Sequence, residues 1–253
     1  MNTYKVPVVS NTKLLSNTYL LKCYSPELAS SITPGQFCNI KVSESDFPLL
    51  RRPFSICDVE DNYIFFMFDV HGEGTKLLAE KSEGDLLDLL GPLGNGFGLD
   101  DNYETAVIVA GGIGAAPFPY LIRKLADAKF IRAFIGGRSQ GNIVTHGFIN
   151  FALASDDGSA GFHGNVVQLL ESELPQFDLV KIKVFGCGPN AMLRALKIFC
   201  ENNNINCELS VECAMACGFG ICQGCPVENE GESSRYLLVC KDGPVFNAKD
   251  VII

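Results

Sequence analysis

The sequence lacks the features that mark disordered, secreted or membrane-spanning chains. Its 253 residues contain no long polar or low-complexity tract and no internal repeat. The first 22 residues mix polar and apolar types, without the basic start and apolar run of a signal peptide. The most apolar stretch, residues 106–122, is short for a membrane span and is broken by glycines and prolines. We therefore expect a soluble, cytoplasmic protein that crosses no membrane.

Basic residues and histidines are also scarce. The chain has 20 Lys and Arg against 29 Asp and Glu, which gives a formal net charge of −9. Because nucleic-acid binding needs clustered positive charge, nucleic acid is not expected as a partner. The three histidines, His71, His146 and His163, form no acid–base constellation, so no catalytic residue is predicted. We expect His71 to contact a cofactor and the other two to be exposed or structural.

Cysteine, in contrast, is abundant, with eleven residues in the chain. Five of them fall between Cys213 and Cys240, and concentrated cysteines in an intracellular protein indicate metal or redox chemistry. The other six have apolar neighbours and are expected to be buried thiols. These six are Cys23, Cys38, Cys57, Cys187, Cys200 and Cys207.

The strongest chemical motif is Cys217-x4-Cys222-x2-Cys225, followed by Cys240 after fourteen further residues. This spacing is typical of plant-type 2Fe–2S sites, in which four thiolates bind one cluster. Glycines between these cysteines allow the backbone to wrap closely and offer N–H donors to sulfur. A structural zinc site is the alternative, although zinc ribbons usually bring two Cys-x2-Cys pairs and only one is present. Cys213 lies outside this spacing and is given no role.

The chain divides into three segments by pattern. Residues 1–99 contain short apolar and β-branched runs separated by turns, which favours an antiparallel six-stranded β-barrel. The strands are expected at residues 4–9, 18–24, 36–42, 54–59, 63–70 and 85–90. Residues 100–208 alternate strands with helices, which predicts a parallel-sheet α/β domain. Its strands are expected at 106–110, 130–136 and 181–186, and its helices from 114 to about 128 and at 189–202. Residues 209–253 form a small, glycine-rich and cysteine-rich subdomain for the cluster.

Two motifs in the first segment suit a flavin dinucleotide. Residues 51–55, Arg-Arg-Pro-Phe-Ser, offer a guanidinium for a diphosphate and a serine that could hydrogen-bond flavin N5. Residues 72–75, Gly-Glu-Gly-Thr, precede a short helix whose first backbone amides could bind phosphate. Either motif alone could be a solvated arginine pair or an ordinary turn, but their order within one barrel favours a cofactor site. The predicted flavin contacts are Arg52, Pro53, Phe54, Ser55, Asp69, Val70, His71, Gly72, Gly74 and Thr75.

Two glycine-rich turns in the second segment suit a nicotinamide dinucleotide. Residues 111–117, Gly-Gly-Ile-Gly-Ala-Ala-Pro, and residues 186–189, Gly-Cys-Gly-Pro, each follow a predicted strand. Strand ends that face one crevice are where a dinucleotide binds an α/β sheet. Glycines needed only for helix packing would explain one such turn but less easily both. The predicted contacts are Gly111, Gly112, Gly114, Cys187, Gly188 and Pro189.

These motifs, in this order, resemble the ferredoxin–NADP reductase superfamily, in which a flavin barrel precedes a nicotinamide domain. Residues 52–55 match its Arg-x-Tyr-Ser motif, with Phe54 in the tyrosine position. The cluster run at 215–225 with Cys240, together with residues 156–159 and 185–193, resembles the electron-transfer subunits of NAD-linked dihydroorotate dehydrogenases.

The resemblance implies FAD and a 2Fe–2S cluster as cofactors, with NAD as co-substrate. It also implies an FMN-containing catalytic partner subunit, in a heterotetramer of two copies of each chain, working in pyrimidine biosynthesis. Electrons would pass from FMN through the cluster and FAD to NAD⁺. NADP stays open, because Arg138 and Ser139 follow the second α/β strand and could accept a 2′-phosphate.

Two other functions stay open. One is a flavin and iron–sulfur NAD(P)H reductase subunit of the NADH-dependent ferredoxin–NADP oxidoreductase or sulfide dehydrogenase type. In that type an aspartate is typical where this chain has Cys217, so the all-cysteine set favours the dihydroorotate family. The other is a non-redox protein with structural zinc.

Overall fold

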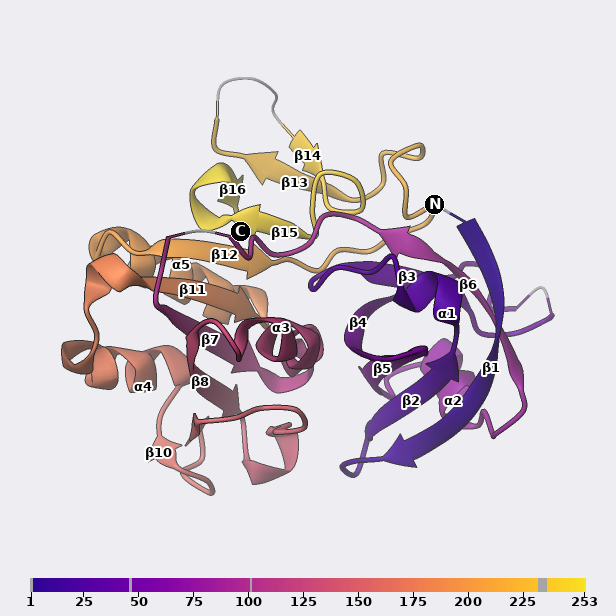
Figure 1. The fold of residues 1–253 in the computed structure, drawn as a ribbon, viewed down its shortest axis with the longest axis horizontal. Coiled ribbons are helices and arrows are strands. Elements are labelled where there is room, and N and C mark those ends of the chain that lie inside the picture. The colour runs from indigo at the N-terminus through magenta and orange to yellow at the C-terminus, as the bar shows by residue number, and fades with distance from the viewer. Residues whose placement is uncertain (1, 46, 101, 232–235) are drawn as a thin grey trace.

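The computed structural model describes residues 2–45, 47–100, 102–231 and 236–253. Two bodies lie side by side in Figure 1, a β-barrel on the right and a layered α/β unit on the left. A small sheet lies above the α/β unit, and the cluster loop between β12 and β13 reaches over toward the barrel. None of the helices within the described ranges is both long and apolar enough to cross a membrane.

The first body is a closed antiparallel barrel of six strands, which confirms the predicted six-stranded barrel. The strands are arranged in the order β1-β2-β5-β4-β3-β6. The strand predicted at residues 4–9 extends further in both directions in the structure. Its two ends pair with different neighbours, β6 at the start and β2 toward the end. Two short helices connect strands, α1 (Pro26–Ala29) and α2 (Glu73–Ala79). The strands are β1 (Asn2–Lys13), β2 (Thr18–Tyr24), β3 (Phe37–Lys41), β4 (Arg52–Glu60), β5 (Tyr63–Asp69) and β6 (Leu86–Leu93).

The second body is built on a seven-stranded sheet in the order β10-β9-β8-β7-β11-β12-β15. All neighbours pair in parallel except β15, which runs antiparallel to β12 and comes from the C-terminal segment. The boundary predicted between residues 208 and 209 falls within β12. The strands are β7 (Thr105–Gly111), β8 (Phe130–Gly137), β9 (Phe151–Ser155), β10 (Phe162–His163), β11 (Ile182–Cys187), β12 (Asn206–Ser210) and β15 (Val245–Asn247).

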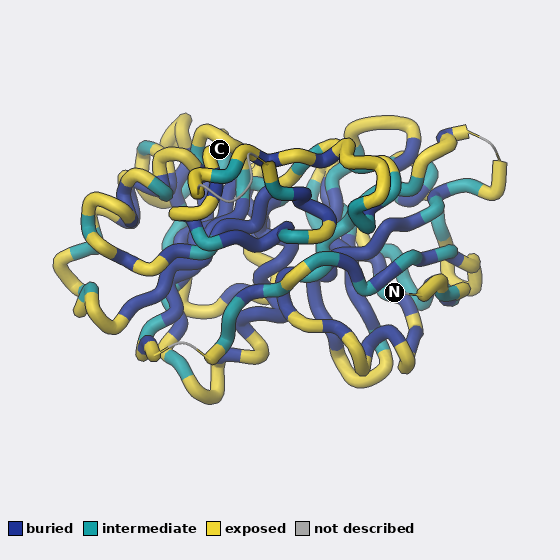
Figure 2. The backbone as a smooth tube through the Cα atoms, turned by 90° about the horizontal axis from the view of Figure 1, so that it is seen from above, coloured by how far each residue is buried: buried dark blue, intermediate teal, exposed yellow. Residues whose placement is uncertain are grey.

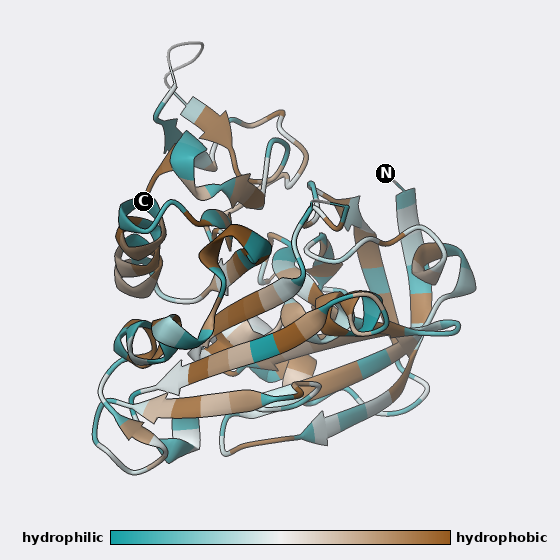
Figure 3. Cartoon of the chain, turned by 60° about the vertical axis from the view of Figure 1, so that its left-hand side comes forward, coloured by the Kyte–Doolittle hydropathy of each residue, from teal (hydrophilic) through white to brown (hydrophobic). Residues whose placement is uncertain are grey.

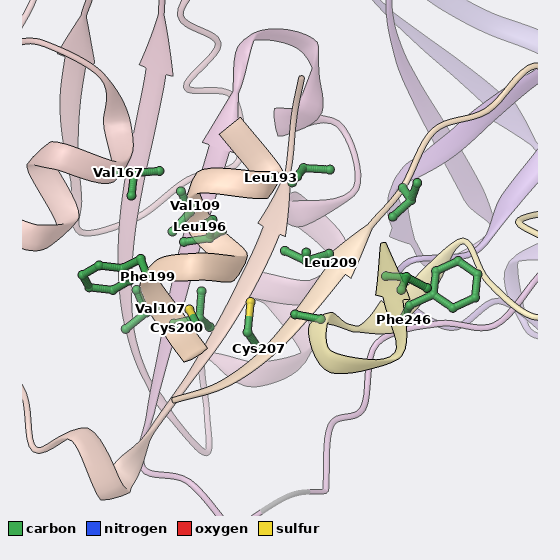
Figure 4. Close-up of a cluster of buried hydrophobic side chains, with 14 of the residues drawn as sticks. Val107, Val109, Val167, Leu193, Leu196, Phe199, Cys200, Cys207, Leu209 and Phe246 are labelled. Carbon is green, nitrogen blue, oxygen red and sulfur yellow. The ribbon is translucent and has the colours of Figure 1, made fainter. Parts of the chain in front are cut away.

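Helices cover both faces of this sheet. Alternate residues of β7 point to opposite faces, so Ala106 and Ile108 join the core under α3 (Phe118–Leu125). Val107 and Val109 join the core under α4 (Val166–Glu173) and α5 (Asn190–Asn202). Figure 4 shows Leu196 of α5 beside Val109, and Figure 3 shows hydrophobic residues along the central strands.

The helix expected from residue 114 starts later than predicted. Residues 112–115 form a 3₁₀ turn, and α3 begins at Phe118 with Pro119 in its first turn. Proline lacks an N–H and fits only the first turn of a helix, which explains the late start. The 3₁₀ turns are η1 (Gly112–Ala115), η2 (Gln140–Asn142), η3 (Leu174–Gln176), η4 (Leu179–Lys181) and η5 (Ala248–Asp250).

The C-terminal segment adds a three-stranded sheet in the order β14-β13-β16. Its strands are β13 (Pro226–Asn229), β14 (Tyr236–Leu238) and β16 (Val251–Ile252). Two cluster cysteines, Cys225 and Cys240, are buried in the same core as α4 and α5. The six scattered cysteines are all buried, as expected. Figure 2 shows buried segments in the interior of both bodies and exposed ones mainly in surface turns.

Candidate functional site

A pocket of about 260 Å³ lies in the crevice between the barrel and the α/β unit. Its walls come from four parts of the chain that are far apart in sequence. The barrel contributes Phe37, Pro53, Phe54, Ser55, Met67, Phe68, Asp69, His71 and Thr75, and the turn after β7 contributes Ile113 and Ala116. The end of β12 and the segment after it contribute Ser210, Val211, Glu212, Cys213 and Met215, and Pro244 completes the lining. The structure therefore brings six predicted flavin contacts together in one cavity.

A larger hollow of about 440 Å³ lies at the amino ends of β11 and β12, beside Ile182 and Asn206. It contains none of the predicted site residues. Ligands of open α/β sheets bind at the carboxyl ends of the strands, so the crevice pocket is the better candidate despite its smaller volume.

The two flavin motifs are in contact at Arg52 and Gly74. A Cβ atom at Gly74 would lie 3.2 Å from Arg52 Nε, so glycine permits this close approach. Arg52 also donates to the Leu50 carbonyl at 2.6 Å. The neighbouring Arg51 points elsewhere, because its guanidinium pairs with the Asp88 carboxylate at 2.8 Å.

Internal hydrogen bonds fix the turn that precedes α2. Thr75 Oγ1 accepts from the N–H groups of His71 at 2.9 Å and Gly72 at 3.1 Å. These two N–H groups therefore serve the turn itself rather than a phosphate. Val70 exchanges backbone and side-chain hydrogen bonds with Asn17. Asp69 accepts from the Thr18 hydroxyl at 2.5 Å.

The two nicotinamide turns pack against each other at the carboxyl ends of β7 and β11, which are neighbours in the sheet. A Cβ at Gly114 would lie 2.5 Å from the Cys187 carbonyl oxygen, and one at Gly188 would lie 3.1 Å from the Gly111 nitrogen. Gly112 has φ +56°, a conformation that favours glycine. Pro189 is the N-cap of α5. The Cys187 thiol is buried in the core and does not line the pocket.

The loop after β8 is hydrogen-bonded to the loop after β9. The Asp156 N–H donates to the Gly137 carbonyl at 3.1 Å, and the Gln140 N–H donates to Ser159 Oγ at 2.8 Å. These bonds join residues 137–140 to residues 156–159, where the adenosine end of a dinucleotide would lie. Arg138 is exposed there. Hydrogen bonds from the Ser159 hydroxyl and N–H lower the pKa of Asp157.

Sequence reasoning missed the five pocket residues that precede the cluster, namely Ser210, Val211, Glu212, Cys213 and Met215. Desolvation raises the pKa of Glu212, and the charge of His71 acts against that rise. The Glu212 side chain is open to solvent at the pocket mouth yet surrounded by protein, so it is recessed rather than buried. Its position follows from the parallel sheet, since residues just after β12 must lie at the crevice. That strand was not predicted from the sequence.

The four cluster cysteines lie in and around one loop. Cys225 and Cys240 are buried with their sulfurs 3.1 Å apart, whereas Cys217 is half-buried and Cys222 exposed. Backbone N–H groups point at the sulfurs: Gly220 to Cys240 at 3.2 Å, Cys222 to Cys217 at 3.4 Å, and Cys240 to Cys225 at 3.5 Å. Burial raises the pKa of Cys217, but hydrogen bonds from the backbone and from the Cys222 thiol outweigh it and lower the pKa to about 6.

This donor set suits an iron–sulfur cluster. Thiolates are its usual ligands, and N–H groups directed at sulfur stabilise their negative charge. In the described ranges, no three His, Cys, Asp or Glu side chains converge as they would on a single metal ion. The cysteines of a 2Fe–2S cluster bind two separate iron atoms and need no such common point.

Comparisons with known proteins agree with this geometry. Residues 212–252 match the model of the iron–sulfur cluster binding domain of dihydroorotate dehydrogenase B. The chain is 36% identical over 255 residues to the dihydroorotate dehydrogenase B (NAD(+)) electron transfer subunit of Caldanaerobacter subterraneus subsp. tengcongensis, with 98% of each chain covered. It is 38% identical over 252 residues to that of Lysinibacillus sphaericus, covering 96% of this chain and 95% of the relative.

A solved structure of an NADH-dependent reduced ferredoxin-NADP oxidoreductase superposes with a TM-score of 0.86 and 26% identity, covering 99% of this chain and 91% of that chain. That likeness extends over the barrel, the sheet and the cluster segment together. The full-length identity to the curated relatives is higher and decides the family. The chain belongs to the family of dihydroorotate dehydrogenase B (NAD(+)) electron transfer subunits.

Proposed function

We propose that the chain is the electron-transfer subunit of a dihydroorotate dehydrogenase, an oxidoreductase component that passes electrons from a catalytic subunit to NAD⁺. One observation carries this proposal. The segment after β12 lines the crevice pocket with Met215, and two residues later it supplies the first cluster cysteine, Cys217. A flavin site and a cluster site that share one short segment are arranged for electron transfer between them.

Bound FAD supplies the step between one-electron and two-electron chemistry, because a cluster passes single electrons and NAD⁺ accepts a hydride. The chain's own residues hold the reactants for this. Arg52 offers a charged fork to a diphosphate, and Ser55 presents a hydroxyl in the pocket. The paired turns at Gly114 and Gly188 let a dinucleotide backbone approach the sheet closely. The cysteines Cys217, Cys222, Cys225 and Cys240 bind the cluster.

The partner is an FMN-containing catalytic subunit, in a complex with two copies of each chain in the cytoplasm. The exposure of Cys222 and its neighbour Ile221 supports a contact at the cluster loop, since electron transfer requires proximity. A second candidate function is reduction of a ferredoxin-like acceptor. The TM-score of 0.86 to the ferredoxin-NADP oxidoreductase favours it, whereas the match of residues 212–252 to the dihydroorotate dehydrogenase B model favours the first proposal.

The test is the visible absorption of the anaerobically purified chain before and after addition of NADH. We expect flavin bands with a broad iron–sulfur shoulder, both bleached by NADH. Addition of an FMN-containing catalytic subunit and dihydroorotate to the oxidised chain should bleach the same bands. A colourless protein after reconstitution with FAD, iron and sulfide would contradict the redox function. Bleaching by NADH but not by dihydroorotate with its dehydrogenase would favour the second candidate.

A further inference from the structure

We propose that Asn39 is a positioning residue that holds the first cluster turn against β3, the strand beside the flavin motif of β4. The inference rests on the proposed function and adds a residue to it. Asn39 lies in the middle of β3 with only 1% of its surface exposed. Its amide Nδ2 donates to the backbone carbonyl of Cys217 at 3.3 Å, across 178 positions of sequence.

The same residue also borders the flavin motif. In the ladder between β3 and β4, Asn39 stands opposite Pro53, the second residue of the Arg-Pro-Phe-Ser motif. Arg51 secures this part of the strand, because it donates to the Asn39 carbonyl at 3.5 Å and to the Asp88 carbonyl at 2.7 Å. One buried amide therefore connects the strand that lines the flavin pocket to the first ligand turn of the cluster.

The cluster loop is shaped to receive this amide. Gly218 has φ +80°, and a Cβ atom there would lie 2.0 Å from Asn39 Nδ2. No side chain other than hydrogen could occupy that space while the amide stays in place. The turn at Gly218 and the amide of Asn39 therefore fit together as one contact.

Packing alone does not explain why residue 39 is an asparagine. Asn39 Oδ1 is buried and has no hydrogen-bond partner within the described part of the chain. A buried polar atom without a partner is destabilising, and an apolar side chain of similar size would avoid that cost. The asparagine supplies a hydrogen-bond donor to the Cys217 carbonyl, which an apolar side chain would not do. Because electron-transfer rates fall steeply with distance, fixing this turn also fixes the separation between cluster and flavin.

The first test compares Asn39→Leu with Asn11→Leu. Asn11 is a matched control, because it is a barrel asparagine whose Oδ1 likewise has no partner among the described residues. Its Nδ2 donates to carbonyls near the end of α2, away from the cluster loop. In the metal-free chain, alkylation of Cys217 by iodoacetamide should accelerate in Asn39→Leu only. In the loaded chain, the cluster's EPR spectrum and reduction potential should shift, and cluster-to-flavin transfer should slow about tenfold, as for other residues that support metal ligands.

A second pair of variants tests the contact from the other side and does not depend on Asn39→Leu folding. Gly218→Ala should reproduce the Asn39→Leu changes. Gly84→Ala is its control, since Gly84 has φ +88° but open space where the Cβ would be, so it reports backbone strain alone. If both cluster-side variants match their controls in alkylation, EPR spectrum and transfer rate, the positioning role is wrong while the proposed function stands. A wild-type chain that assembles no cluster would overturn both.

Discussion

At the scale of single residues, Cys213 and Cys217 lie close in sequence but in different surroundings. Cys213 lines the crevice pocket, where burial and the nearby Cys225 raise its pKa. Cys217 receives backbone hydrogen bonds that favour its thiolate, the form that binds metal. The spacing predicts Cys217, and not Cys213, as the cluster ligand, and the backbone N–H groups directed at Cys217 suit that role.

We expect Cys213→Ser to retain the full iron and sulfide content of the wild-type chain. Cys222→Ser removes an exposed ligand and should lose the cluster, because serine oxygen is a poor replacement for thiolate sulfur at iron. Iron and acid-labile sulfide analysis, with visible circular dichroism, measures both variants. Equal loss in the two variants would mean that Cys213 takes part in cluster binding.

A second residue-scale prediction concerns Lys183, whose side chain is 1% exposed and pairs with Glu208 at 2.8 Å. Lys183→Met should lower the free energy of unfolding by about 3 kcal/mol, because it leaves a largely buried carboxylate without its cation. The control is Lys181→Met, which breaks an exposed pair with Glu104 and should leave stability unchanged within error. Urea unfolding followed by circular dichroism measures both. Equal urea midpoints for the two variants would show that burial of the Lys183–Glu208 pair contributes nothing to stability.

At the scale of elements, α3 joins the α/β unit to the barrel. Arg123 at its C-terminal end forms a two-pronged ion pair with Asp58 of β4, with Nε 2.9 Å from Oδ1, and also contacts Glu60 at 2.7 Å. Tyr120 of the same helix donates to the Ile32 carbonyl at 3.4 Å. Because these contacts join α3 to the barrel, we expect them to hold the turns at residues 111–117 and 186–189 in place relative to the crevice pocket.

Arg123→Ala should therefore slow flavin reduction by NADH about tenfold, since small misplacements of reacting groups are costly. The FAD content should be unchanged. Arg132→Ala is the control, because Arg132 makes an equally close pair with Glu173 inside the α/β unit. That variant should lose stability without slowing the reaction. Stopped-flow absorbance measures the reduction rate, and similar rates for the two variants would refute the orienting role of Arg123.

The elements that could be predicted from sequence share strong local patterns. The barrel strands are short apolar and β-branched runs bounded by turns, β7 is a continuous apolar run, and β8 is apolar apart from Arg132, so local pattern and length locate them. The strands β13, β14 and β16 are only two to four residues long and lie among glycines and cysteines. Such short strands have no readable period, and partners far along the chain decide their pairing.

The parts of the site that belong to sequence motifs were predictable, and the parts that only the fold brings into place were not. Spacing marked the four cluster cysteines, and glycine-rich turns marked the strand ends that meet at Gly114 and Gly188. Their roles in binding stay predictions. Glu212 and Asn39 were not predictable, because neither belongs to a motif. Each acquires its position only when β12 ends at the crevice and when the cluster loop folds over β3.

At the scale of the whole molecule, the cluster loop is the part of the cluster site open to a partner. Ile221 in this loop is 76% exposed and Cys222 beside it is exposed, whereas Cys225 and Cys240 are buried in the core. Interface centres are apolar and exclude water, so we expect the catalytic subunit to bind over this exposed aliphatic side chain and the exposed cysteine beside it.

Ile221→Glu should then weaken complex formation with the catalytic subunit by at least about tenfold, because a buried charge without a partner is costly at an interface. NADH reduction of the flavin within this chain should be unchanged, because Ile221 itself does not line the crevice pocket. The control is Val180→Glu, at a residue 89% exposed in η4, just before the amino end of β11 and so at the sheet edge opposite the crevice. Analytical ultracentrifugation measures complex formation, and stopped-flow absorbance measures reduction of the flavin by NADH. If Ile221→Glu and Val180→Glu bind the catalytic subunit equally well, the contact lies elsewhere on the surface.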